Sequence, residues 1–259
     1  MVRARKRFGQ HFLEPAWVTK VICAIDPVGS DAFVEIGPGR GALTRPLAAQ
    51  AGRVTAVEID RDLASDLRAA ALPNVSIVEG DFLELARSAL PSDARLRVAG
   101  NLPYNVAAPI LFTLVDWFGG TGTLTDATLM LQREVADRLV AAPGTREYGV
   151  LTVLIGHSAQ VKRLLALPPG AFRPPPKVHS ALVQLRFHAP DPPVRDLSAF
   201  RGLVQAVFTR RRKTLANALL AFRESSPQPA LERAGIDGKR RPETLTIAEF
   251  ARLSDEMEP

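Results

Sequence analysis

Val34-Glu35-Ile36-Gly37-Pro38-Gly39-Arg40-Gly41 leads from a short strand-like run, Ala32–Ile36, into a segment whose apolar residues have helical spacing. Glycines at such a turn let the backbone reverse sharply and let a ligand approach it closely. Gly37, Gly39 and Ala42 also satisfy the relaxed G-x-G-x-x-A pattern of dinucleotide-binding turns. A glycine-rich turn can also be a plain connection, so the neighbouring segments decide its meaning.

Residues 31–132 repeat this alternation of strand-like and helix-like segments. The expected strands are Ala32–Ile36, Arg53–Ile59, Val75–Val78, Leu96–Ala99 and Ala127–Leu131, and the expected helices are 42–51, 61–71, 82–90 and 106–118. Such alternation indicates an α/β fold with βαβ units and a parallel sheet covered on both faces. Further helices are expected at Gln132–Ala142 and Tyr148–Gly156, and the strands Val161–Leu167 and Val178–Phe187 are expected to form an antiparallel hairpin at the sheet edge.

Prolines cluster at Pro190, Pro192 and Pro193, which indicates a domain junction. We therefore expect one domain at 1–190 and a small all-helical domain at 191–259. The expected helices of the second domain lie near 196–209, 213–222, 228–234 and 246–254, the last with a capping box from Thr246 to Glu249. A tail of this length is marginal by itself and is expected to pack on the main domain.

The composition is basic, with 33 Lys and Arg against 27 Asp and Glu in 259 residues, which favours a polyanionic partner. Cys23 is the single cysteine and is expected to be a buried, inert thiol, so a disulfide or cysteine-rich zinc site within the chain is excluded. The four histidines have no metal-ligand spacing, and we expect no metal. No signal peptide or membrane-length apolar run is evident, so a cytoplasmic location is expected.

Two acidic residues follow expected strands. Glu58 ends the second strand, 21 residues after Gly37, where an acid can accept hydrogen bonds from both ribose hydroxyls of an adenine nucleoside. Asp81 follows the third strand and can accept from the adenine amino group, or it can cap the next helix. Both roles are compatible, because they use nearby atoms.

Asn101-Leu102-Pro103-Tyr104 follows the fourth strand. An amide oxygen and a backbone carbonyl here can accept both hydrogens of an exocyclic amine, and Pro103 holds the turn without offering an N–H. Tyr104 can then stack on a flat base, although an ordinary loop with a half-buried tyrosine is the alternative. The glycine-rich turn, Glu58, Asp81 and this tetrad fall on four successive strand ends, which is where open α/β sheets bind ligands.

Taken in order, these motifs resemble those of the ribosomal RNA adenine N6,N6-dimethyltransferases, and most closely the bacterial small-subunit (16S) branch. The resemblance covers nearly the whole chain, and the ordered set is specific where no single motif is. Its motifs are Phe8–Leu13, Val34–Thr44, Glu58, Gly80-Asp81, Asn101–Asn105, Leu131–Val135, Phe172–Val178 and Phe208–Leu215.

The resemblance implies a catalytic domain in 1–190, which contains a Rossmann-like class I methyltransferase sheet and includes a basic N-terminal arm, and a helical RNA-binding domain in 191–259. It implies S-adenosylmethionine as the methyl donor and dimethylation of adenosines in small-subunit ribosomal RNA, either free or in immature subunits, by an enzyme that we expect to be a monomer. The implied cofactor contacts are Gln10, His11, Leu13, Gly37, Gly39, Glu58, Asp81 and Asn101. The implied contacts to the target adenine are Asn101, Leu102, Tyr104 and a second aromatic wall, Phe172.

Two positions depart from the common family pattern. His11 stands where many members have Asn, and Ala107-Ala108 stands where Ser-Thr is frequent. The second change removes two hydroxyls, so these positions have no side-chain hydroxyl to contribute, but it leaves the tetrad intact.

Arg210, Arg211, Arg212 and Lys213 form a basic block between two expected helices of the tail. Such a block can bind phosphates of folded RNA, which is recognised largely by shape and backbone, although charge runs are often simply solvated. The alternatives to the small-subunit enzyme are a large-subunit methyltransferase that confers antibiotic resistance and a non-catalytic assembly factor. A nicotinamide oxidoreductase is more remote, because it has no particular use for the tetrad.

Overall fold

The computed structural model describes residues 11–85, 90, 95–223 and 226–257, and these residues form two compact units. The first contains the described residues up to Ala136 and Val161–Phe187; the second contains Asp137–Gln160 and the described residues from His188 onward. This division differs from the expected single boundary at 190. Residues 137–160 belong with the C-terminal helices because α6 (Val150–Gly156) packs against α7 (Leu197–Thr209).

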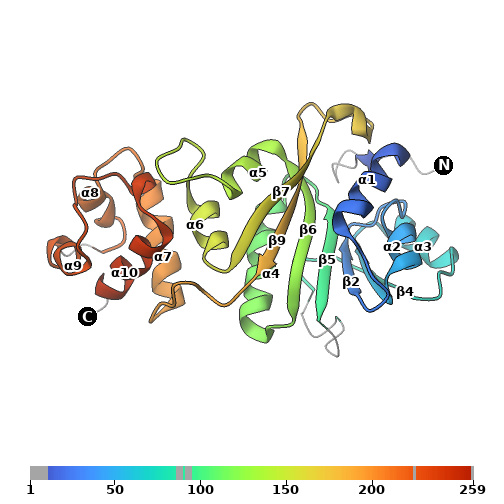
Figure 1. Cartoon of the computed structure of the whole chain (residues 1–259), viewed down its shortest axis with the longest axis horizontal. Coiled ribbons are helices and arrows are strands. Elements are labelled where there is room, and N and C mark those ends of the chain that lie inside the picture. Colours follow the sequence, from blue (N-terminus) through green and yellow to red (C-terminus); the bar gives the residue numbers. More distant parts are fainter. Residues whose placement is uncertain (1–10, 86–89, 91–94, 224–225, 258–259) are drawn as a thin grey trace. The chain divides into compact units, whose positions relative to one another are not determined.

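The first unit is built on a seven-stranded sheet (Figure 1). Its order is β4 (Val75–Glu79), β3 (Arg53–Glu58), β2 (Ala32–Ile36), β5 (Leu96–Asn101), β6 (Leu124–Gln132), β9 (Ser180–Phe187) and β7 (Ala159–Leu167). Adjacent strands from β4 to β6 are parallel, whereas β6 and β9 are antiparallel. The expected parallel sheet is therefore confirmed, and the expected hairpin strands lie side by side at its edge.

The order of the strands reverses beside β2. From β2 the chain proceeds to β3 on one side, and later returns to β5 on the other. The loops that follow β2 and β5 consequently diverge and leave a crevice at the carboxyl ends of the two strands, which is the usual ligand site of such sheets.

Helices α1 (Pro15–Ile25) and α2 (Thr44–Gln50) pack on the sheet through one apolar cluster, which includes Val21, Leu47 and Phe33. The first unit also contains α3 (Arg61–Ala69), α4 (Ala107–Thr121) and the start of α5 (Arg133–Leu139). The expectation of a buried Cys23 is wrong: the thiol is exposed, because its position falls on the face of α1 that points away from this cluster.

Two expected helix starts have different outcomes. Residues 82–84 form a turn rather than the start of a helix, and 86–89 lie outside the described residues. Helix α4 begins at Ala107, with Val106 as its N-cap and without a side-chain cap hydrogen bond. The Ala107-Ala108 pair is therefore compatible with the helix start without the two hydroxyls of Ser-Thr.

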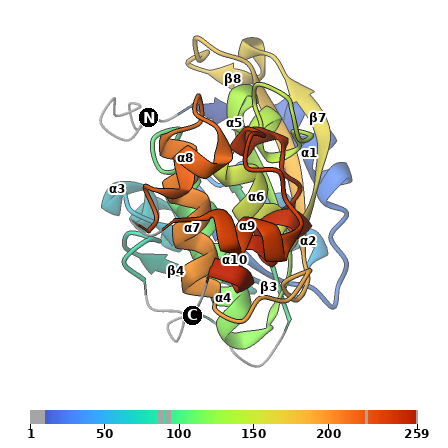
Figure 2. The same ribbon diagram turned by 90° about the vertical axis from the view of Figure 1, so that its left-hand side faces the viewer.

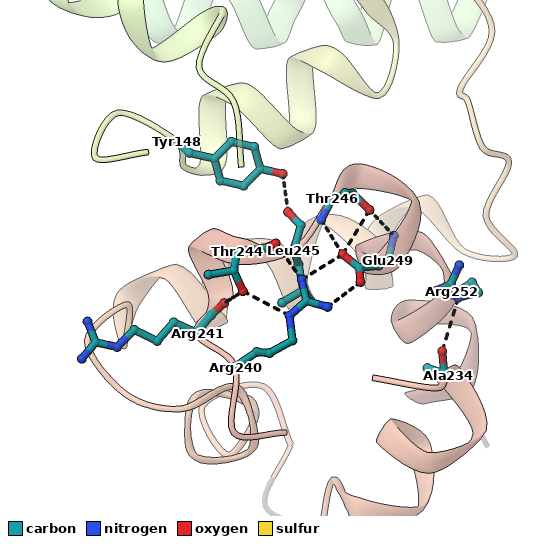
Figure 3. A network of polar contacts seen from close by, with 9 residues as sticks. All are labelled: Tyr148, Ala234, Arg240, Arg241, Thr244, Leu245, Thr246, Glu249 and Arg252. Atoms are coloured by element: carbon teal, nitrogen blue, oxygen red, sulfur yellow. Dashed lines mark hydrogen bonds and ion pairs between the residues drawn. The ribbon is translucent and has the colours of Figure 1, made fainter. Parts of the chain in front are cut away.

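The second unit is helical. Figure 2 shows α7 with α8 (Leu215–Leu219), α9 (Gln228–Ala234) and α10 (Ile247–Met257). The expected capping box is confirmed, since Thr246 N–H donates to Glu249 Oε2 and Glu249 N–H donates to Thr246 Oγ1. Figure 3 shows that Arg240 donates to both carboxylate oxygens of Glu249, and that Tyr148 donates its hydroxyl hydrogen to the Leu245 carbonyl at 2.7 Å. The last bond ties segment 137–160 to the C-terminal helices.

Candidate active site

A pocket opens at the carboxyl ends of β2, β3 and β5, at the crevice beside β2. Its lining combines the glycine-rich turn, the strand-end acids, the Asn-Leu-Pro-Tyr tetrad and the N-terminal segment. The residues are His11, Phe12, Leu13, Glu35, Gly37, Pro38, Gly39, Ala42, Leu43, Glu58, Ile59, Asn101, Leu102, Pro103, Tyr104 and Met130. The structure thus brings together eight of the residues expected from the sequence: His11, Leu13, Gly37, Gly39, Glu58, Asn101, Leu102 and Tyr104.

The glycine-rich turn needs its glycines for backbone reasons. Gly37 and Gly39 have φ angles of +65° and +58°, a region that other residues rarely adopt. A Cβ on Gly37 would meet no atom within 4 Å, so its φ angle, not crowding, explains the glycine. At Gly39 a Cβ would also lie 3.3 Å from the Phe12 ring, so the N-terminal segment approaches this turn closely.

Glu58 is buried at the end of β3 and holds the turn in place. Its Oε2 accepts from Gly39 N–H and its Oε1 accepts from Asp60 N–H, both at 2.9 Å. Burial raises the pKa of Glu58, and these two backbone hydrogen bonds oppose that shift. Each carboxylate oxygen has a further lone pair, so Glu58 can support the turn and also accept from a ligand hydroxyl.

Two lining residues were not anticipated as functional. Ile59 follows the strand-end acid and is 49% exposed, so it presents an apolar surface to the pocket. Glu35 is buried within β2, and burial raises its pKa to about 8, with the neighbouring Glu58 charge adding to the shift. The signals available in the sequence were an apolar residue directly after Glu58 and an acid inside the otherwise apolar run Ala32–Ile36.

Asn101 is oriented by the N-terminal segment. Its Nδ2 donates to the His11 carbonyl at 2.7 Å. Because a carbonyl can only accept, this contact assigns the amide nitrogen to the His11 side. Oδ1 is then the acceptor that the Asn101 side chain can offer to a ligand amine in the pocket.

Tyr104 and His11 form a stacked pair, with ring centroids 5.8 Å apart and planes inclined by 24°. The imidazole is also held by a 2.7 Å hydrogen bond between its Nδ1 and the Pro174 carbonyl, in which Nδ1 must be the donor. The Tyr104 ring therefore stands in the pocket as a flat surface next to a second ring.

The N-terminal segment reaches the pocket through a small sheet. Strand β1 (Phe12–Leu13) pairs with β8 (Phe172–Arg173), and Leu13 lies opposite Phe172. Glu14 adds an ion pair with Arg173 at 2.7 Å. These contacts bring the segment that contains His11 to the carboxyl ends of the central strands.

Two of the expected cofactor and base contacts that the structure describes do not line this pocket. Phe172 is 1% exposed and belongs to the apolar core with Leu13, because its pairing with β1 directs it into that cluster. Asp81 accepts from Leu83 N–H at 2.9 Å, a local hydrogen bond that supports the turn at 82–84. Gln10 lies outside the described residues, as do the N-terminal cations.

The four residues of the basic block, 210–213, differ in burial and in their hydrogen bonds. Arg211 is half-buried and donates to the carbonyls of Arg146 and Thr145 at 2.7 and 3.0 Å. Arg210, Arg212 and Lys213 are exposed. Arg211 therefore has a structural role within the second unit. Arg210 makes one longer hydrogen bond, to the Asn217 carbonyl at 3.4 Å, and like Arg212 and Lys213 it remains exposed to solvent.

The described part of the chain contains no cluster of His, Cys, Asp and Glu suited to a metal ion. Among the same residues, no helix is both long and apolar enough to cross a membrane.

Comparisons with known proteins agree with this geometry. The family described as "Ribosomal RNA adenine dimethylase" matches residues 1–258. "Ribosomal RNA small subunit methyltransferase A" of Acinetobacter baylyi is 46% identical over 262 residues, covering 99% of this chain and 93% of that protein.

Two solved structures share the architecture. A dimethyladenosine transferase from Plasmodium falciparum superposes with a TM-score of 0.79 at 24% identity, covering 94% of this chain and 96% of that one. The 23S rRNA methyltransferase ErmE superposes with a TM-score of 0.69 at 28% identity, covering 96% of this chain and 100% of that one. The first likeness shows the fold, and together they confirm a methyltransferase sheet with C-terminal helices.

Proposed function

Because the chain belongs to the ribosomal RNA adenine dimethylase family, we propose that it transfers methyl groups from S-adenosylmethionine to the N6 atoms of adenosines in small-subunit ribosomal RNA, twice per adenosine. The observation that carries this proposal is the oriented carboxamide of Asn101 beside the Tyr104 ring. An acceptor and a flat apolar surface at one strand end suit an aromatic base with an exocyclic amine.

The amine needs help from the protein, because its lone pair is conjugated with the ring. Asn101 Oδ1 and the Leu102 carbonyl accept its two hydrogens and favour the tetrahedral geometry that attack requires. The same two acceptors stabilise the positive charge that develops on the nitrogen. The alkylated nitrogen is acidic and releases its proton to water, so the mechanism requires no dedicated base.

The residues around the glycine-rich turn fit the cofactor. Space remains next to Gly37, where a Cβ would meet no atom within 4 Å. Glu58 can accept from ribose hydroxyls, and the exposed Ile59 side chain can pack on the adenine ring. S-adenosylmethionine supplies a methyl group on positively charged sulfur, and His11 and Leu13 would close over its binding site from the N-terminal side.

The target base has to leave its stack to enter this pocket, which costs a few kcal/mol if it begins stacked. Stacking on Tyr104 offsets about 1–3 kcal/mol of that cost. Alignment of the amine with the methyl group then accounts for much of the remaining catalysis.

One feature supports RNA of the small subunit as the substrate, and a second supports binding to RNA in general. The relative named for the small subunit is 46% identical, whereas the 23S enzyme is 28% identical. Arg210, Arg212 and Lys213 are exposed in the second unit and can contact RNA phosphates. In this proposal, 1–190 contains the catalytic site and 191–259 contributes RNA contacts, and a monomer acts in the cytoplasm.

One experiment tests the proposal directly. The protein is incubated with a labelled methyl donor and, separately, with immature small and large ribosomal subunits, and the modified nucleosides are identified by mass spectrometry. We expect N6,N6-dimethyladenosine in the small-subunit RNA and its loss in Asn101→Ala. Label in the large subunit alone would support the antibiotic-resistance enzyme, and binding without label would support an assembly factor.

A further inference from the structure

Tyr104 has a second contact, at the far end of its ring from the backbone. Its hydroxyl lies 3.0 Å from Ser180 Oγ, which is hydrogen-bond distance. Either oxygen can be the donor, because both are hydroxyls. The ring is thus held at its tip by Ser180 and faces His11 on one side.

Ser180 is well placed to hold a partner still. It is 2% exposed, at the first position of β9, and lies opposite Gln132 in the antiparallel pairing with β6. The adjoining Arg133 N–H also donates to the His179 carbonyl at 2.9 Å. The Ser180 hydroxyl is therefore attached to backbone that is held in place by the pairing of β9 with β6 and by the hydrogen bond from Arg133 to His179.

Tyr104, by contrast, stands on a turn between β5 and α4 and is only partly buried. A side chain on a turn has fewer neighbours to restrict its rotamer than one on a packed strand. The hydrogen bond to Ser180 links this turn residue to the rigid sheet. It therefore restricts both the direction and the tilt of the ring.

We infer that Ser180 is a positioning residue, whose hydroxyl holds the Tyr104 ring at the angle required to stack on the substrate base. The inference rests on the proposed function, since it requires a base on the Tyr104 ring. Ser180 itself is not among the residues that line the pocket. Its removal leaves the stacking surface in place but lets the ring tilt, so the amine is less often aligned for attack.

The test compares Ser180→Ala, Tyr104→Phe and the double variant under single-turnover conditions with small subunits. One net hydrogen bond corresponds to about a three- to tenfold change, so each single variant should lose about that much methylation rate. Because both remove the same bond, the double variant should lose no more than the larger single loss. Cofactor affinity by calorimetry should stay within about twofold of the wild type.

Two further variants separate positioning from general loss of stability. Ser180→Thr keeps the hydroxyl and should recover most of the rate. Ser254→Ala removes another buried hydroxyl, on α10, and should leave the rate unchanged. The melting temperature of each variant is measured alongside, so that partial unfolding is not mistaken for misalignment.

Full activity of Ser180→Ala, additive losses in the double variant, or a parallel fall in cofactor affinity would each overturn the inference. If Ser180→Thr does not fold, the inference is still tested by whether the losses of Ser180→Ala and Tyr104→Phe are additive in the double variant. Failure of the wild-type protein to methylate adenosine is a different result: it refutes the proposed function, and the positioning role with it.

Discussion

The two ends of the central sheet differ in how their buried charged groups are paired. At the amino ends of the strands, Arg97 donates to both carboxylate oxygens of Asp126, to Asp31 Oδ2 at 2.7 Å and to the Ile25 carbonyl at 2.7 Å. At the carboxyl ends, Glu35 and Glu58 are buried close enough for the Glu58 charge to raise the pKa of Glu35, and among the described residues no cation lowers the pKa of either.

This difference separates stability from binding within one sheet. The Arg97 cluster compensates its charges internally and joins the end of α1 to β2, β5 and β6. The opposite end leaves acceptors unsaturated and an acid protonated near neutral pH, which disfavours the folded state but prepares a site for a polar ligand. Changes at the first end should therefore affect the melting temperature, and changes at the second should affect ligand affinity and its pH dependence.

The largest expected effect is on stability, at the amino ends. Arg97→Met leaves Asp126 and Asp31 without their shared cation, and burial already raises the pKa of Asp126 even beside Arg97. The free energy of unfolding should fall by about 3–5 kcal/mol. Thermal and urea denaturation measure this loss, and Asp126→Asn in the same chain should recover part of it. A loss below about 1 kcal/mol would contradict the assignment of this cluster to stability.

At the carboxyl ends the next effect is on binding. Glu58→Ala removes the acceptor expected for the ribose hydroxyls, and S-adenosylmethionine affinity should fall by about 1.5–3 kcal/mol, measured by calorimetry. Because Glu58 also accepts from Gly39 and Asp60, some stability is lost as well. Glu58→Gln keeps one acceptor and serves as the control. Unchanged cofactor affinity in Glu58→Ala would exclude the role.

The third effect is on the pH dependence of stability. The pKa of Glu35 in the folded protein, about 8, lies above its ordinary value of 4.5, so between these values the folded state binds the extra proton. The contribution of Glu35 protonation to the free energy of unfolding is therefore complete below pH 4.5. It is lost as pH rises toward 8, where the buried carboxyl group has to ionise. Glu35→Gln cannot ionise, so from about pH 6 to 8 the wild type should lose about 2 kcal/mol more than the variant. Parallel stability profiles by urea denaturation would show that Glu35 is ionised throughout.

The smallest expected effect concerns the basic block, where Arg211 is expected to contribute to stability and the other three cations to RNA binding. Arg211→Gln removes hydrogen bonds to two carbonyls and should cost about 1 kcal/mol of stability. Replacing Arg210, Arg212 and Lys213 with Gln should leave the melting temperature unchanged. The triple variant should also weaken RNA binding and reduce its salt-dependence slope by about 0.7–0.9 for each phosphate that is no longer neutralised. A wild-type salt slope in the triple variant would mean that these three charges are only solvated.

Much of the first unit could be predicted from the sequence because its signals are local. Ala32–Ile36 was predicted to the residue, and the helix expected near 228–234 in the second unit is α9, since apolar periodicity and flanking breakers mark strand and helix limits. The expected strand Ala127–Leu131 was too short: β6 extends over Leu124–Gln132, because pairing with β5 and β9 continues beyond the most apolar residues. Tertiary hydrogen bonds, unlike periodicity, leave little trace in the local sequence.

By itself the sequence determined the succession of strands and helices along the chain, the glycines of the turn and the strand-end positions of the motifs, because each depends on neighbouring residues and on backbone geometry. Only the tertiary structure decided how the side chains of these residues are oriented and buried. The orientation of the Asn101 amide depends on His11, 90 residues earlier, and the position of the Tyr104 ring on Ser180, 76 residues later. Phe172 lies in the core because β1 pairs beside it. Local sequence specifies conformations and chemical groups, but burial and long-range hydrogen bonds specify which groups can act together.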